Sequence, residues 1–188
     1  MSLYNLDLQS VFTITKSQRT ETIPMSHLQQ IKEKIKDWSS AKKQVQEWQD
    51  QGLEIVFTNG CFDLLHYGHL HYLAEARDLG DRLVIGLNSA ESVSRLKGRH
   101  RPINDEITRQ FSLASLSFID LVVVFPEDTP HGLIQLLQPD ILVKGGDYEI
   151  KDIVGAELVL ERGGAVKTLD FVPGYSTTKI EQKIKGLS

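Results

Sequence analysis

Two histidines that flank a tyrosine and a glycine, in His66-Tyr67-Gly68-His69, have a spacing suited to anion binding. Imidazoles at positions i and i+3 of a helix start project to the same side. Free backbone N–H groups and the positive end of the helix dipole point the same way. Gly68 carries no side chain, so a phosphate can approach the backbone there. The motif predicts a phosphate site, with packing or surface histidines as the alternative for so short a pattern.

A third histidine, His71, introduces the alternative of a zinc site. However, His71 is two residues from His69 and is expected to face elsewhere on a helix. No nearby cysteine pair completes a tetrahedral ligand set. We therefore expect an anion site and no metal-binding side chains.

The single cysteine, Cys61, precedes these histidines and is interpreted as a small residue that lines the same pocket. One cysteine forms no internal disulfide, which is typical of a reducing compartment. The sequence shows neither a signal-peptide core nor a long apolar span. We therefore expect a cytoplasmic protein.

Size and charge narrow the class of partner. The 188 residues suit one domain with a modest extension, and 40% hydrophobic with 24% charged residues is a globular balance. A formal net charge of -4 argues against sequence-independent nucleic-acid binding. Scattered lysines and arginines argue against a polybasic membrane patch. We expect neither nucleic acid nor a membrane as a partner.

The elements that must position the histidines alternate in type. Short apolar runs at residues 55–58, 83–87, 121–125, 141–143 and 166–169 predict five strands. Helical stretches separate them, which indicates a doubly wound parallel sheet with helices on both faces. In such sheets, ligands bind beyond the carboxyl ends of the strands, near the switch point. Because the first strand leads directly into the histidine motif, the motif is expected at that edge.

The helices of this region have recognisable starts. They are expected to begin at His66, near Asn104, at Pro130 and after the N-cap Ser176. In the first, over residues 66–79, an inward stripe of Leu70, Leu73 and Ala74 is predicted.

The first 52 residues are predicted to be an arm and helical extension that precedes a main domain at residues 53–188. Residues 1 to about 25 are a poorly specified arm. After it, apolar residues recur at helical spacing between the N-cap Ser26 and Gly52: Leu28, Ile31, Ile35, Trp38 and Val45. One or two helices that pack on the main domain are expected, with a partner-binding helix as the alternative.

Several separate motifs follow one another along the chain: TNGCFDLLHYGH at residues 58–69, RLKG at 95–98, RPIN at 101–104, EDTP at 127–130, LVKGGDY at 142–148 and STTKI at 176–180. Together they resemble the cytidylyltransferase-like nucleotidyltransferases, and most closely the adenylyltransferase domains of ADP-heptose synthases. The resemblance covers roughly residues 53–185. It implies a Rossmann-like fold and transfer of AMP from ATP to D-glycero-β-D-manno-heptose 1-phosphate in lipopolysaccharide precursor synthesis.

The resemblance also implies roles for particular residues. The catalytic residues are expected to be His66, His69 and Lys97. Nucleotide contacts are expected from Asn59, Gly60, Cys61, Phe62, Gly68, Lys144, Gly145, Gly146, Asp147, Ser176, Thr177 and Thr178. Acceptor contacts are expected from Asp63, Arg109 and Tyr148. Mg²⁺ is expected to bind through the nucleotide phosphates, with few or no direct protein ligands.

Several of these residues could instead have no role in ligand binding. In that interpretation Lys97 is a solvated loop lysine. Ser176 is simply an N-cap, a role that can coexist with phosphate binding. For Arg109 the alternative is a surface ion pair. For Asp63 it is a hydrogen bond to the loop backbone. The turn at residues 144–147 is then an ordinary tight turn.

The implied reaction needs no general base because the acceptor is already a phosphate. Two other functions stay open. A glycerol-3-phosphate cytidylyltransferase would use CTP, but those enzymes carry an arginine three residues before the last-loop glycine, where this chain has Phe171 before Gly174. Pro173 and Tyr175 fit neither subgroup. A non-catalytic nucleotide-binding module would be expected to have lost the phosphate-contacting residues. A homodimer is a further hypothesis.

Overall fold

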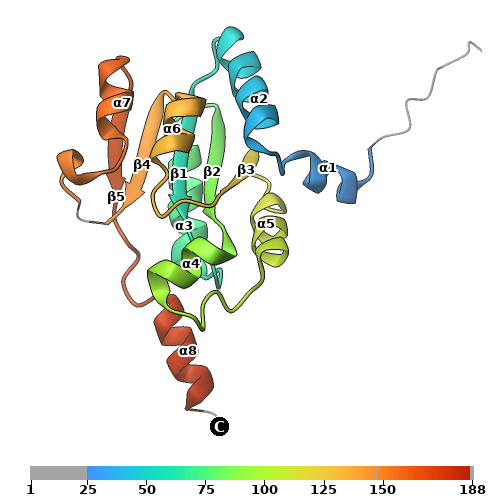
Figure 1. The fold of residues 1–188 in the computed structure, drawn as a ribbon, viewed down its shortest axis with the longest axis vertical. Helices are drawn as coiled ribbons and strands as arrows, with labels where there is room; N and C mark the ends of the chain where they lie inside the picture. The colour runs from blue at the N-terminus through green and yellow to red at the C-terminus, as the bar shows by residue number, and fades with distance from the viewer. Residues whose placement is uncertain (1–24, 147, 187–188) are drawn as a thin grey trace, which may run out of the picture.

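The computed structural model describes residues 25–146 and 148–186, so the predicted arm at residues 1–24 lies outside the described residues. Their strands are β1 (Ile55–Gly60), β2 (Arg82–Asn88), β3 (Leu121–Phe125), β4 (Ile141–Gly145) and β5 (Ala165–Leu169). They form one parallel sheet in the order β3-β2-β1-β4-β5 (Figure 1). The predicted five-stranded, Rossmann-like α/β sheet is confirmed, and each strand contains the whole of its predicted run.

Helices cover both faces of this sheet (Figure 1). They are α1 (His27–Glu33), α2 (Trp38–Asp50), α3 (Tyr67–Arg77), α4 (Ala90–Lys97), α5 (Glu106–Ala114), α6 (His131–Leu137), α7 (Ala156–Glu161) and α8 (Thr177–Lys185), with a 3-10 turn at Ile150–Asp152. Buried side chains of α2, α6 and α7 pack on one face, and those of α3 and α5 pack on the other. Alternate strand residues feed the two layers, since Ile55 and Phe57 join the first and Val56 the second.

The central pair of strands, β1 and β4, separates where the strand order reverses. Six residue pairs are in register between β1 and β2, whereas β1 and β4 are paired at Val56–Ile141 and Phe57–Leu142. At the next position the hydroxyl of Tyr72 from α3 fills the gap. It hydrogen-bonds with Thr58 Oγ1 at 2.6 Å and donates to the Val143 carbonyl at 3.2 Å. A crevice therefore opens beyond this bridge, at the carboxyl ends of the strands.

Most predicted helix starts are observed. Ser176 caps α8 and accepts from the Lys179 amide, and α3 starts one residue after His66. The start near Asn104 is one residue early, because Asp105 is the cap of α5. Pro130 is the N-cap of α6, not its first residue.

The predicted inward stripe of α3 is partly wrong. The buried residues of this helix are Tyr72, Leu73 and Ala76, whereas Leu70 is 37% exposed. Tyr72 faces inward because its hydroxyl finds partners on β1 and β4, and this turns Leu70 outward. Helices α4 and α7 were not predicted, since they contain only eight and six residues and present short apolar patterns.

The N-terminal helices pack on the main domain, as expected. Ser26 caps α1, and Asp37 caps α2 after a break at residues 34–36. The break has a physical cause, because Ile35 pairs in parallel with Val122 of β3. The indole of Trp38 then donates to the Val124 carbonyl at 2.8 Å. Within the described residues, no helix is long and apolar enough to cross a membrane.

The Tyr72 bridge predicts a measurable loss of stability. Tyr72→Phe removes the hydroxyl and leaves the Thr58 hydroxyl and the Val143 carbonyl buried without it, so the free energy of unfolding should fall by about 1–3 kcal/mol. Urea unfolding measures this. Tyr67→Phe, at a tyrosine that is 51% exposed, is the matched control and should be neutral. Equal stability of the Tyr72→Phe and wild-type proteins would contradict the bridge.

Candidate functional site

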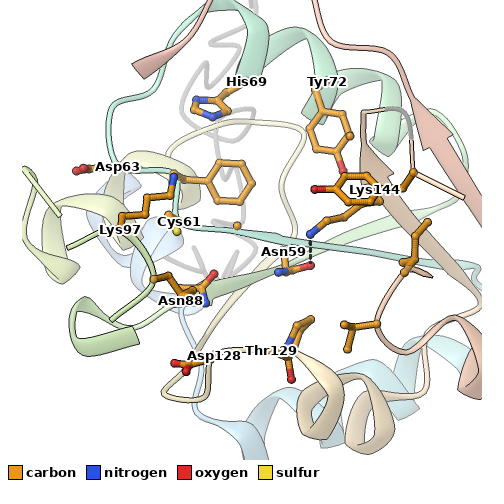
Figure 2. Close-up of a pocket in the computed structure, with 18 of the residues that line it drawn as sticks. Asn59, Cys61, Asp63, His69, Tyr72, Asn88, Lys97, Asp128, Thr129 and Lys144 are labelled. Carbon is orange, nitrogen blue, oxygen red and sulfur yellow. Dashed lines mark hydrogen bonds between the residues drawn. The ribbon is translucent and has the colours of Figure 1, made fainter. Parts of the chain in front are cut away.

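A cavity of about 570 Å³ lies beyond the carboxyl ends of the strands, where β1 and β4 diverge. Its lining comes from the residues after each strand and from α3, α4 and α8 (Figure 2). The lining residues are Asn59, Gly60, Cys61, Phe62, Asp63, His69, Tyr72, Asn88, Leu96, Lys97, Asp128, Thr129, Pro130, Lys144, Gly145, Tyr148, Asp152, Ile153, Val154, Phe171 and Thr177.

The floor of the cavity continues the bridge made by Tyr72. One residue further along each strand, Lys144 Nζ donates to Asn59 Oδ1 across the gap at 3.3 Å. Burial lowers the pKa of Lys144 and outweighs the opposing effect of Cys61. Among the described residues, no carboxylate forms an ion pair with this half-buried lysine. An anionic ligand would supply the missing charge.

The two motif histidines lie together at the start of α3, as their spacing predicts. Their rings stack with centroids 3.8 Å apart and an interplanar angle of 17°. His66 is the N-cap, and its Nδ1 accepts from the His69 amide at 3.3 Å. In the neutral ring the proton is then on Nε2, which is available as a donor to a ligand oxygen.

His69 is held neutral by its surroundings. Burial lowers the pKa of His69 to about 4, and the neighbouring His66 acts in the same direction. The ring of Phe62 meets His69 edge-on at 5.4 Å, and its backbone has φ 43°, an uncommon value for a residue other than glycine. Lys97, at the end of α4, is exposed and lines the same cavity.

A second helix N-terminus lies beside the first. Ser176 caps α8 through its hydroxyl, so its alternative role as an N-cap is confirmed. Tyr175 packs on Tyr67 with ring centroids 5.0 Å apart. A Cβ on Gly68 would lie 3.2 Å from the His66 ring and 3.3 Å from Tyr175 Cβ. Gly68 therefore allows the two helix starts to approach each other.

Asp63 organises the loop between α4 and α5. Its carboxylate accepts from the amides of Ile103 and Asn104 and from Arg101 at 2.8–2.9 Å. Burial alone would raise the pKa of Asp63, but these hydrogen bonds outweigh burial and hold the pKa below its ordinary value. Arg101 also pairs with Glu181 of α8. The alternative of a hydrogen bond to the loop backbone is therefore observed, and acceptor contact by Asp63 stays a prediction.

Arg109 binds backbone carbonyls at the carboxyl ends of β1 and β2. It is 1% exposed, so the alternative of a surface ion pair is wrong. One guanidinium nitrogen, Nη1, donates to the carbonyls of Cys61 at 3.0 Å and Asn88 at 2.7 Å. Within the described chain, Nε and Nη2 are buried without a hydrogen-bond partner. Arg109 does not line the cavity, and its contact with an acceptor stays a prediction.

The structure brings together most of the residues singled out from the sequence. The described ones that do not line the cavity are His66, Gly68, Arg109, Gly146, Ser176 and Thr178. Asp147 lies outside the described residues. The sequence reasoning missed several lining residues, among them Tyr72, Asn88, Thr129 and Phe171. Asn88, Thr129 and Phe171 follow or end a strand, so applying the carboxyl-end rule to every strand would have found them.

The three histidines near the start of α3 do not converge. His71 lies against Glu75, with Nδ1 3.2 Å from Oε2. Within residues 25–146 and 148–186, no group of three or more His, Cys, Asp or Glu side chains is arranged to hold a metal ion. The arrangement of stacked imidazoles, lysines and two helix starts is suited to phosphate groups.

Comparison with known proteins relates this site to a family. The family model described as Cytidylyltransferase-like matches residues 57–183. The Bifunctional protein HldE of Wolinella succinogenes is 47% identical over 174 residues, which is 93% of this chain and 36% of that protein. The Bifunctional protein HldE of Magnetococcus marinus is 54% identical over 152 residues, 81% of this chain and 31% of that protein. The chain thus spans about a third of the length of these relatives.

A solved structure is also similar. It is the crystal structure of the lipopolysaccharide core biosynthesis protein from Thermoplasma volcanium, which is 31% identical with a TM-score of 0.52. The match covers 64% of this chain and 98% of that chain. The similarity therefore extends over nearly all of the smaller protein.

The loop around Asp63 predicts an acid-dependent loss of stability. Because its folded-state pKa is lowered, the Asp63 carboxylate stabilises the fold above its unfolded pKa of about 4, and this contribution is lost as the pH falls through the folded value. Asp63→Asn should lower the free energy of unfolding at pH 7 by about 1–3 kcal/mol and by less at pH 3. Urea unfolding at both pH values measures this. An equal loss at both would contradict the assignment.

The amine of Lys144 is expected to lower the stability of the fold and to raise its affinity for anions. Lys144→Met relieves the burial of an amine, so the free energy of unfolding should be unchanged or rise by up to about 1 kcal/mol. Affinity for inorganic pyrophosphate should fall about tenfold with the lost charge-assisted hydrogen bond. Calorimetric titration measures this affinity, with Lys167→Met as the control because Lys167 is an exposed lysine of β5. Unchanged affinity in Lys144→Met would remove this lysine from the anion site.

Proposed function

The chain belongs to the cytidylyltransferase-like family, and on that premise we propose that it transfers the adenylyl group of ATP to D-glycero-β-D-manno-heptose 1-phosphate. The products are ADP-heptose and pyrophosphate. The observation that carries the proposal is the stacked pair of His66 and His69 at the start of α3, beside a cavity that Lys97 also lines. The choice of acceptor rests on the ordered motifs, and the similarity to the HldE proteins supports it.

The chemistry is an in-line displacement at the α-phosphorus. An oxygen of the acceptor phosphate forms the new phosphorus–oxygen bond, and the bond to the bridging oxygen of pyrophosphate breaks on the opposite side. Because the nucleophile is already an anion, no base has to remove a proton. The protein's task is to position the two phosphates and stabilise the charge that develops between them.

The site residues divide this task. His66 offers Nε2–H, since its Nδ1 is engaged by the His69 amide. His69, with its pKa of about 4, acts as a neutral donor and not as an imidazolium. Lys97 supplies positive charge, and Thr177 at the start of α8 offers a hydroxyl and amide to the leaving pyrophosphate.

Magnesium is proposed to enter bound to the nucleotide phosphates, where it neutralises charge on the triphosphate. The donor set of the cavity agrees with this role. Of the three carboxylates in the described lining, Asp63 is engaged by Arg101 and Asp128 by Arg95 at 2.7 Å, which leaves Asp152. Phosphate oxygens and water would then supply most of the ligands.

Two alternatives are less well supported. A glycerol-3-phosphate cytidylyltransferase is disfavoured because Phe171, which lines the cavity, occupies the place of the expected arginine. A non-catalytic binding module is disfavoured because His69, Lys97 and Thr177 are retained and lie around one cavity.

Pyrophosphate release, measured for ATP and CTP crossed with heptose 1-phosphate and glycerol 3-phosphate, tests the proposal. Release is expected with ATP and heptose 1-phosphate. In that reaction His69→Ala should lower kcat by about 10²–10³, as expected for a donor to a developing charge. His71→Ala is the matched control, because His71 lies against Glu75 and does not line the cavity.

Other outcomes are equally clear. Activity confined to CTP and glycerol 3-phosphate would replace the proposed reaction with the cytidylyltransferase one. No release in any combination would reject both reactions. Near-normal kcat in a folded His69→Ala protein would reject the role given to His69.

A further inference from the structure

Part of the cavity lining is apolar and has no role in the proposed transfer chemistry. Figure 2 shows His69 and Lys97 on one side of Asn59, with Tyr72 and Lys144 on the other. The lining also contains an apolar group that is defined here as the apolar wall: Tyr148, Ile153, Val154 and Phe171. Tyr148, Val154 and Phe171 are 50%, 41% and 67% exposed, which is high for large apolar side chains in a concave site.

Phe171 lies directly over the backbone of the turn that follows β4. A Cβ built on Gly145 or on Gly146 would lie 2.8 Å from a carbon of the Phe171 ring. Gly146 also has φ 106°, a conformation that side chains rarely adopt. The two glycines therefore let the ring rest against the main chain, while much of it remains open to the cavity.

The chemistry of this wall selects among the groups of the substrates. A heptose carries several hydroxyl groups, and each needs a hydrogen-bond partner when it leaves water. A purine presents two flat faces that stack on aromatic rings and lose no hydrogen bond in doing so. Phosphates are accommodated by the cationic half of the cavity. The base is therefore the substrate group that best matches the apolar wall.

We propose that Phe171 is a stacking platform for the purine base of the nucleotide, with Val154 and Tyr148 completing the base pocket. Tyr148 then contacts the base instead of the acceptor that the sequence resemblance implies. This inference rests on the proposed function, whose nucleotide it locates. It makes Phe171 a specificity-determining residue, because a phenyl ring gains more contact with a two-ring purine than with a one-ring pyrimidine. Asn59 then lies between the base pocket and the side of the cavity that His69 and Lys97 line.

Substitutions at Phe171 in the full chain test the proposal. Phe171→Ala should raise the KM for ATP by about tenfold or more, since one base–aromatic stack is lost. It should leave kcat within about threefold and the KM for the sugar phosphate unchanged. Phe171→Trp should keep the wild-type KM for ATP, and Phe171→Leu should be intermediate. Leu160→Ala is the matched control, because Leu160 is 49% exposed and lies outside the cavity lining.

Direct binding separates this inference from the proposed reaction. Calorimetric titration with ATP and with CTP needs no acceptor, so it reads the base pocket even if no pyrophosphate is released. Phe171→Ala should weaken ATP binding about tenfold and CTP binding by less. Equal affinities of the Phe171→Ala and wild-type proteins for ATP would overturn the platform. A rise confined to the KM for the sugar phosphate would also overturn it, and assign the apolar wall to the acceptor.

Discussion

Divergence of β1 and β4 is the constraint on which the site depends. The ladder between them ends at Phe57 and Leu142, and the Tyr72 hydroxyl then satisfies Thr58 and Val143 across the gap. Burial raises the pKa of Tyr72 to about 12, so the hydroxyl keeps its proton as a donor. Without this bridge, polar groups would be left unpaired at the base of the crevice. The crevice is thus an ordered opening in the sheet. Asn59 and Lys144 lie at its floor, one residue beyond the Tyr72 bridge.

Around this opening, loops from distant parts of the chain are joined by charged groups. Asp63 binds the loop at Ile103 and Asn104, and Arg101 of that loop contacts both Asp63 and Glu181. The start of α3 is therefore connected to α8 through one arginine. No residue of α8 is fully buried, and this contact and the packing of Tyr175 on Tyr67 contribute to its position beside the cavity. Both helices thereby help to preorganise the proposed phosphate site.

The sequence predicted the sheet well because buried parallel strands are almost continuous apolar runs. It predicted the histidine pair because helical spacing alone brings i and i+3 together. Arg109 was assigned to the ligand, although Leu113 lies four residues later on the same buried face of α5, a signal that was readable. No comparable spacing in the sequence indicates the role proposed for Phe171. The position of its ring depends on Gly145 and Gly146, which lie at the end of a different strand.

The short pairing of Ile35 with Val122 has a consequence for the sheet as a whole. An uncovered edge strand presents N–H and C=O groups that can recruit another chain. Here the Val122 amide donates to the Lys34 carbonyl, and the Lys36 amide donates to Val122. The N-terminal segment therefore shields the β3 edge against strand addition. A fragment that began at the predicted domain boundary, residue 53, would leave that edge bare and prone to aggregate.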